Sequence, residues 1–281
     1  MSAAEATLAT PARRRIRIQG TTIAGALIVA LFLLCAAVPD LIAPYNPNNF
    51  DYRALLKPPS AAHWFGTDNF GRDMLSRTIW AARIDLQIAV FCTLFPAIFG
   101  TLAGCIIGYT GGALDTVFRR LVDVLVTIPF LILVIAIIAV LGPGLLNMYI
   151  AVSAVNWIIY ARLMRAEILT QKRRDYAAAG RVMGYGATRI IFRHLLPNAV
   201  SPVMVYWMTD MALAILLGSS LGYLGLGAQP PTSEWGVLIG DAKNFMTTAW
   251  WMSIFPGIAI VVAGTGFSLL GDGLSGWLRR R

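Results

Sequence analysis

The sequence predicts an all-α polytopic membrane protein with six transmembrane helices. Of its 281 residues, 57% are hydrophobic and only 13% are charged, whereas soluble domains carry about 45–50% and about 25%. Apolar stretches of about 20 residues, the length that spans a bilayer, recur near residues 21–43, 85–109, 124–142, 147–164, 200–226 and 251–275. Too little polar surface remains to cover a globule in water, which excludes the soluble classes.

Glycine and proline mark the ends and contacts of these stretches. Gly142-Pro143-Gly144 separates the third from the fourth as a tight turn. Interior prolines at Pro96, Pro129 and Pro256 are expected within helices, because neighbouring helices can satisfy the freed carbonyls. Gly100, Gly104 and Gly108 repeat the small-residue spacing that lets two helices approach closely.

The basic residues predict the orientation and explain the net charge of +9 without nucleic-acid binding. Most of them fall on one side of the six spans, the side expected to face the cytoplasm together with both termini. These are Arg13, Arg14, Arg15, Arg17, Arg119, Arg120, Arg162, Arg165, Lys172, Arg173, Arg174, Arg181, Arg189, Arg193, Arg279, Arg280 and Arg281. The opposite side takes Arg53, Lys57, Arg72, Arg77, Arg83 and Lys243. A cleaved signal peptide is the alternative for the first stretch, with Arg13–Arg17 as its basic region, but the apolar run is long enough to span.

The chain lacks the residue patterns of an enzyme or an ATP-driven motor. None of its three lysines follows a glycine, so no phosphate-binding G-x-x-x-x-G-K-[ST] loop is present. The two histidines, His63 and His194, fall on opposite membrane sides, which excludes a shared acid–base pair or a histidine metal site. A G-x-S-x-G match at 218–222 lies within a span, where small residues serve packing. The sequence therefore predicts no catalytic residue, no metal and no cofactor.

Asp210 is the best candidate for a functional group within a span. A charge in hydrocarbon is costly and marks a functional site by default, so Asp210 is a candidate for lining a translocation path. A structural hydrogen bond to a neighbouring helix is the alternative. Asp272 lies near the inner end of the last span, where Arg279 to Arg281 can neutralise it.

Residues 165–199 form the longest segment on the basic side and read as helix, short break, helix. The second helix is expected to begin at Asp175, to be interrupted by Gly184 and Gly186, and to stop at Pro197-Asn198. Ile190, Ile191, Leu195 and Leu196 supply an apolar stripe. Such a helix is placed to dock into a groove on a partner protein; the alternative is a helix lying flat among lipid headgroups.

Four segments together resemble a family of binding-protein-dependent ABC importer permeases. Residues 175–184 (DYAAAGRVMG) and 193–198 (RHLLPN) are similar to its EAA loop. Residues 65–77 (FGTDNFGRDMLSR) resemble the outer segment of its C-type branch, the permeases of dipeptide, oligopeptide and nickel importers. Residues 224–236 look like that branch's second outer loop, and 269–274 (LLGDGL) like its C-terminal signature.

The resemblance implies a type I importer permease in the inner membrane of a bacterium or archaeon. It implies partners: a second homologous permease, two ATPase subunits, an extracytoplasmic solute-binding protein and membrane lipid. The expected division is a tail, first span and outer loop over 1–84, followed by a five-span permease core over 85–281. Transport of di- or oligopeptides or a related small solute is the implied function; an ATPase-independent transporter or channel is the alternative.

The implied site residues fall into two groups. Coupling to the ATPases is assigned to Asp175, Tyr176, Ala178, Ala179, Gly180, Gly184, His194, Leu196 and Pro197. The outer-loop motif consists of Gly66, Thr67, Asp68, Gly71, Arg72 and Asp73. This chain departs from the family where its EAA pattern has glutamate, alanine and alanine, because here the residues are Ala178, Ala179 and Gly180.

Overall fold

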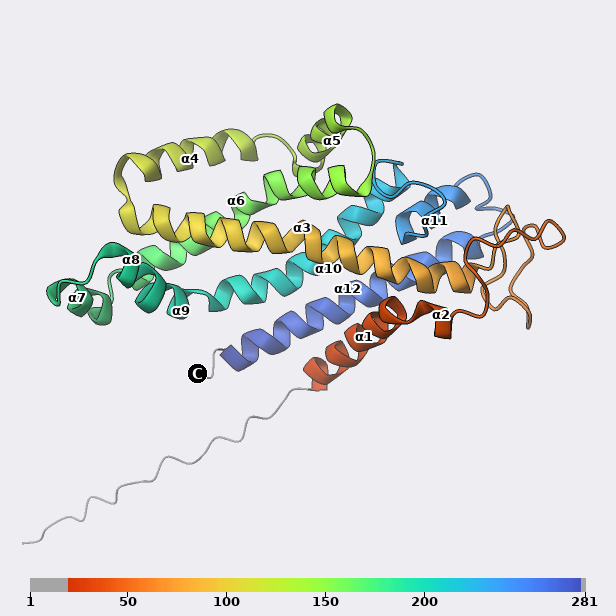
Figure 1. Ribbon diagram of the computed structural model, residues 1–281, viewed down its shortest axis with the longest axis horizontal. Coiled ribbons are helices and arrows are strands. Elements are labelled where there is room, and N and C mark those ends of the chain that lie inside the picture. Colours follow the sequence, from red (N-terminus) through yellow and green to blue (C-terminus); the bar gives the residue numbers. More distant parts are fainter. Residues whose placement is uncertain (1–19, 279–281) are drawn as a thin grey trace, which may run out of the picture.

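The computed structural model describes residues 20–278 as a bundle of long helices, with no β-strand in that range (Figure 1). In chain order the helices are α1 (Gly20–Ala37), α2 (Pro39–Ile42), α3 (Met74–Thr110), α4 (Gly112–Val126), α5 (Phe130–Leu141), α6 (Leu145–Gln171), α7 (Asp175–Val182), α8 (Ala187–Arg189), a π-helical stretch (Ile190–Leu195), α9 (Leu196–Ala199), α10 (Ser201–Tyr223), α11 (Trp235–Ala242) and α12 (Trp251–Leu278). The all-α membrane fold class is confirmed. Arg13–Arg17 and Arg279–Arg281 lie outside the described residues.

Four helices in the described range are long and apolar enough to cross a membrane: α1, α3, α10 and α12. The pair α4–α5 passes the same criterion jointly, although it bends by 88° at its break. Helix α6 has 27 residues but carries Asn147, Asn156, Arg162, Arg165 and Glu167, which lower its mean hydropathy. The chain is therefore a multi-pass membrane protein.

Helix α3 contains the apolar stretch predicted over 85–109 but begins earlier, at Met74. Asp73 caps this helix by accepting a hydrogen bond from the Ser76 backbone N–H at 2.8 Å. A search for apolar runs excludes the first turns of α3 because they contain the charged residue Arg77. In the structure Arg77 is nevertheless buried, because carboxylates lie beside it. The outer loop expected over 44–84 thus ends at residue 73.

The expectation of one continuous helix over 124–142 is also wrong. Helix α4 ends at Val126, and α5 begins only after Pro129. Pro129 stands at the N-cap of α5 with ψ 130°, an extended conformation that ends one helix and starts another. Pro96 and Pro256, by contrast, do lie within α3 and α12 as expected.

Helices α3 and α6 form the closest pair in the bundle, and glycines make that approach possible (Figure 1). A Cβ atom on Gly100 would lie 2.3 Å from the Trp157 carbonyl oxygen, and one on Gly104 would lie 2.5 Å from that of Ala161. Gly108 continues the row, with 3.0 Å to the Arg165 carbonyl oxygen. The expected packing role of these three glycines is confirmed.

The two ends of the bundle differ in composition. One end holds α2, α11 and the loop over residues 43–73, and the other holds α7, α8 and α9 (Figure 1). Arg72 and Arg77 lie at the first end, where both approach Asp241. Arg119 and Arg165 meet at Asp115, near the second end. Within residues 20–278, these four arginines therefore lie in the two groups that the sequence predicts.

Candidate functional site

The connection between α6 and α10 forms a compact helical segment at one end of the bundle. Helix α6 ends at Gln171 and α7 begins at Asp175, which confirms the expected helix, break and helix. The Tyr176 hydroxyl donates to Gln171 Oε1 at 2.9 Å and closes the break. The expected stop at Pro197-Asn198 is wrong, because Pro197 occupies the first turn of α9, which continues to Ala199.

Gly184 ends α7 through a left-handed C-cap. Its φ is +76°, a conformation that side chains with a Cβ rarely adopt. The Tyr185 N–H donates to the Gly180 carbonyl at 3.1 Å, and the Gly184 N–H donates to the Arg181 carbonyl at 3.0 Å. These two hydrogen bonds define a Schellman motif, which satisfies carbonyls that the helix end leaves free. The left-handed backbone expected at Gly184 is therefore present.

The apolar stripe of this segment packs inside the chain itself. Ile190, Ile191 and Leu195 are buried with Tyr160, Met164 and Ile168 of α6 in one core cluster. Ala177 and Gly180 of α7 are buried as well. This packing places the apolar stripe of the segment directly against α6.

A different surface of the segment remains available to a partner. Val182 is 88% exposed and Met183 59% exposed, and Asp175, Ala179 and Gly184 are exposed beside them. Ala178, which stands where the family pattern has glutamate, is half-buried. The exposed apolar tip of α7 is thus a small surface suited to contact with another protein.

His194 and Leu196 stabilise the segment from within. The His194 ring stacks on Tyr185 with centroids 5.6 Å apart, and the Arg189 guanidinium lies 3.9 Å from the centre of the same Tyr185 ring. Leu196 packs against the core cluster around Tyr160 and Leu195. Among the coupling residues assigned from the sequence, Gly180 is buried and the others are half-buried (Tyr176, Ala178, His194, Leu196) or exposed (Asp175, Ala179, Gly184, Pro197).

Asp210 lies buried between α10 and α6. Its Oδ2 accepts a hydrogen bond from Asn156 Nδ2 at 2.8 Å and another from the Tyr160 hydroxyl at 2.7 Å. Asn156 and Tyr160 are four residues apart and share one face of α6. Asp210 and Asn156 also line a pocket of about 370 Å³ with Phe130, Tyr206 and other side chains. The structure therefore shows the hydrogen bond to a neighbouring helix that the sequence analysis gave as the alternative.

The outer-loop motif builds a tight turn against α12. Gly66 and Gly71 have φ of +72° and +75°, and a Cβ on Gly71 would lie 1.9 Å from the Asp51 carbonyl oxygen. The Thr67 hydroxyl donates to the Ala54 carbonyl and accepts from the Lys57 N–H. The Trp251 indole N–H donates to the Thr67 carbonyl at 3.0 Å. No residue other than glycine fits at position 71 without displacing the backbone.

Buried ion pairs join this turn to α3 and α11. Asp68 Oδ2 lies 2.6 Å from both Arg72 Nε and Arg77 Nη1, and all three residues are at most 4% exposed. Asp241, at the end of α11, lies 3.6 Å from Arg77 and 3.7 Å from Arg72. Burial raises the pKa of Asp241, and both guanidinium groups oppose that rise. We call Asp68, Arg72, Arg77 and Asp241 the outer charge cluster. Because Asp68 and Arg72 of the outer-loop motif are buried in this cluster, the motif stabilises the fold of the loop.

A second buried polar contact, which the sequence analysis missed, joins α3, α10 and α11. Asp85 Oδ1 accepts from the Ser219 hydroxyl at 3.3 Å, and Oδ2 accepts from the Trp235 N–H at 3.1 Å. Glu234 caps α11 by accepting from the Gly236 and Val237 N–H groups, and it lies beside Asp85. Both carboxyl groups are 0% exposed, and burial raises the pKa of Glu234.

The G-x-S-x-G match lies in this region and serves packing, as expected. A Cβ on Gly222 would lie 2.0 Å from Glu234 Oε2, and one on Gly218 would lie 2.5 Å from a methyl carbon of Ile88. The Ser220 hydroxyl donates to the Leu216 carbonyl of its own helix. These small residues let Glu234 and Ile88 approach α10.

Comparison with known proteins identifies the family. The model of the inner-membrane component of binding-protein-dependent transport systems matches residues 100–281. The chain belongs to this family. A second model, the N-terminal transmembrane domain of oligopeptide transport permease C, matches residues 8–59. The permease family resemblance seen in the sequence is thereby confirmed, including the C-type branch, and the protein is an inner-membrane permease subunit.

Several relatives align over most of this chain and of their own length. A dipeptide transport system permease of Alkalihalophilus pseudofirmus is 40% identical over 257 residues, which cover 90% of this chain and 83% of the relative. A probable D,D-dipeptide permease of Escherichia coli is 37% identical, with coverages of 90% and 85%. A glutathione transport permease of Pectobacterium atrosepticum is 38% identical, with coverages of 93% and 87%.

The outer charge cluster yields a stability prediction. Asp68→Asn removes the carboxylate that Arg72 and Arg77 share, and it leaves two buried guanidinium groups with Asp241 alone. Breaking a buried ion pair on one side costs about 3–5 kcal/mol. We therefore expect a markedly lower thermal unfolding temperature of the detergent-purified protein and faster proteolysis between residues 43 and 73. Asp40→Asn, at an exposed position on α2, is the matched control and should match the wild type. Equal stability of Asp68→Asn and the wild type would show that the cluster does not hold the loop.

Proposed function

We propose that the chain is one of two permease subunits of an ATP-driven peptide importer. Its partners in this proposal are a homologous permease, two ATPase subunits and an extracytoplasmic solute-binding protein. The names of the relatives, which transport dipeptides or glutathione, favour a peptide substrate. The observation that carries the proposal is the segment between α6 and α10. Its residues Ile190, Ile191 and Leu195 pack against α6, while Val182 and Met183 at the end of α7 are exposed.

The proposal includes six membrane crossings with cytoplasmic termini. The four apolar helices, the bent α4–α5 pair and α6 supply the crossings. In the proposed orientation, the predominance of basic residues on one side favours a cytoplasmic position for α7, α8 and α9 and an external position for α11. In this orientation the ATPases reach the tip of α7, and the solute-binding protein reaches the end that holds α11.

Coupling then follows from rigidity. ATP-driven closure of two ATPases moves the grooves that hold the α7 helices of the two permeases. Because Ile190, Ile191 and Leu195 are packed on α6, a displacement of α7 is passed to α6 without an intervening flexible hinge. Helix α6 carries Asn156 and Tyr160, which hold Asp210 of α10. The proposed result is alternating access, in which the spans move as a rigid body between two positions.

We expect Gly184→Val to abolish coupling while the protein still inserts in the membrane. A β-branched residue cannot adopt φ near +76° without strain, so the Schellman cap and the tip of α7 should lose their shape. Transport and substrate-stimulated ATP hydrolysis of the assembled complex should both fall at least tenfold. The measurement is uptake and ATPase activity of the complex in proteoliposomes.

Two control variants test whether the effect of Gly184→Val comes from the backbone conformation at this position or from poor membrane insertion. Gly184→Asn should retain most activity, because asparagine tolerates the left-handed region and no atom lies within 4 Å of a Cβ at this position within the chain. Gly186→Ala, at an ordinary φ of −64°, should behave like the wild type. Normal transport by Gly184→Val at normal complex yield would refute the coupling role of this segment.

We also propose that Asp210 lines the translocation path. Asp210→Asn keeps an oxygen that can accept from Asn156 and Tyr160, so assembly should persist while loss of the charge lowers transport severalfold. Tyr160→Phe retains the charge and removes one hydrogen bond, and it should transport nearly normally. If Tyr160→Phe is the more damaging variant in the same uptake assay, Asp210 belongs to helix packing instead.

A further inference from the structure

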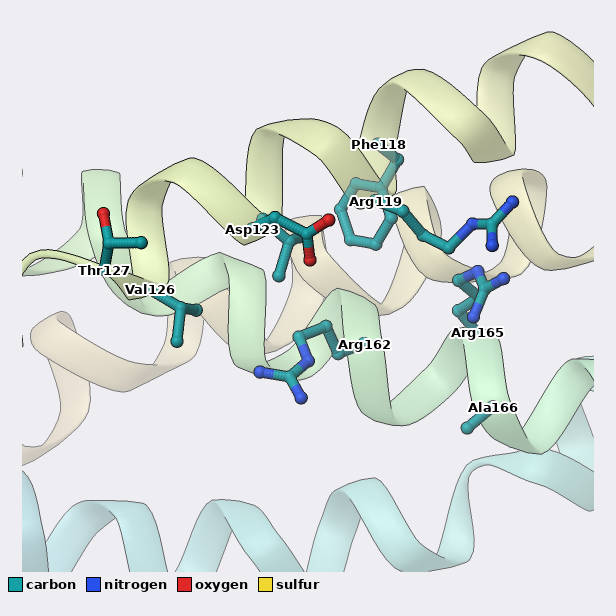
Figure 2. Close-up of a pocket in the computed structure, with 9 residues that line it drawn as sticks. Phe118, Arg119, Asp123, Val126, Thr127, Arg162, Arg165 and Ala166 are labelled. Carbon is teal, nitrogen blue, oxygen red and sulfur yellow. The ribbon is translucent and has the colours of Figure 1, made fainter.

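Helices α4 and α6 enclose a basic groove of about 550 Å³ that the proposed transport cycle does not use. Figure 2 shows Arg119 and Asp123 on α4 facing Arg162 and Arg165 on α6 across this space. Phe118 and Val122 form its apolar floor. Three guanidinium groups therefore converge on one open groove.

The charges within the groove are only partly neutralised. Arg165 makes a two-point contact with Asp115 through Nε and Nη2, and Arg119 Nε lies 3.3 Å from the same carboxylate. Arg162 has no ion pair or hydrogen bond to any residue between 20 and 278, and its side chain is exposed. Asp123 is exposed and makes no ion pair with the described residues. The groove thus retains an excess of positive charge centred on Arg162.

The groove lies where the chain passes from apolar to charged surroundings. On α6, Trp157 packs against Phe118 of α4 with ring centroids 6.2 Å apart, and Arg162 and Arg165 follow on the side toward α7. On the outer side of α4, Val117 and Val124 are 65% and 63% exposed. The groove therefore offers guanidinium groups inside it and an exposed apolar helix face next to it. That combination matches a phospholipid, which has a charged headgroup on apolar chains.

We propose that this groove binds the phosphate of an anionic membrane phospholipid, with Arg162 as its principal contact. A guanidinium group donates two parallel hydrogen bonds to phosphate oxygens, which gives it geometric selectivity for this group. Basic pockets between membrane helices bind anionic headgroups by this chemistry. The net positive charge disfavours headgroups that carry a choline or ethanolamine cation. The proposal concerns lipid binding and does not depend on the coupling of α7 to an ATPase.

The test measures lipid retained by the full-length chain after detergent extraction. Native mass spectrometry should show phosphatidylglycerol bound in preference to phosphatidylcholine and phosphatidylethanolamine when the three are offered in equal amounts. Arg162→Gln should lower phosphatidylglycerol occupancy about fivefold, which is the contribution of one basic side chain at an anionic surface. Arg162→Lys should retain a part of the binding, because the charge remains. Asp123→Asn should bind at least as much as the wild type, since it removes a competing carboxylate.

Arg120→Gln is the matched control, because Arg120 neighbours Arg119 on α4 but does not line the groove. An equal loss in Arg120→Gln and Arg162→Gln would overturn the proposal in favour of diffuse surface charge. Equal binding of phosphatidylethanolamine would overturn selectivity for an anionic headgroup. Displacement of the lipid by inorganic phosphate at low concentration would identify a site for free anions instead. A cross-link from Arg162→Cys to the second permease, with no bound lipid, would assign the groove to the subunit interface.

Discussion

The close packing of α6 on α3 is the constraint on which the other features depend. Gly100, Gly104 and Gly108 leave no room for a side chain, so the α6 backbone rests directly on α3. Helix α6 then carries the partners of Asp210, two arginines of the basic groove and the core on which Ile190, Ile191 and Leu195 pack. Without hydrophobic attraction between helices in lipid, such close contacts supply the association. The hydrogen-bond partners of Asp210, two arginines of the basic groove and part of the core beneath the segment at 187–199 therefore all belong to one helix.

Charged residues in this chain are buried only where the fold supplies partners from distant segments. Asp68 is surrounded by Arg72 and Arg77, and Asp241 reaches the same arginines from α11. Asp85 accepts from Ser219 and Trp235 and contacts Glu234. These contacts link the loop before α3, the N-terminal half of α3, α10 and α11 at one end of the bundle. The segment at the opposite end is held instead by apolar packing with an exposed tip, an arrangement suited to an element that a partner moves.

The sequence predicted those features that depend on local patterns. Apolar runs located the long helices, and Gly184 after a helical stretch predicted a left-handed cap that the Schellman hydrogen bonds confirm. The first turns of α3 were missed because they contain Arg77, whose partner Asp241 lies far away in the sequence. The break at Pro129 was missed because a proline within a span is also compatible with a continuous helix, as Pro96 and Pro256 show. The i, i+4 pair of Asn156 and Tyr160 in an otherwise apolar helix was the available signal for the Asp210 site.

The central claim is that the tip of α7 faces the cytoplasm and contacts an ATPase. Its most direct test is Val182→Cys, since this side chain is 88% exposed, in a chain whose Cys35, Cys92 and Cys105 are replaced by alanine. A membrane-impermeant thiol reagent should label position 182 only after lysis, and a short bifunctional cross-linker should join it to an ATPase subunit in inverted membrane vesicles. Ala62→Cys, at an exposed position of the outer loop, should be labelled in intact cells and should give no ATPase cross-link. Labelling of position 182 from outside intact cells would contradict the account.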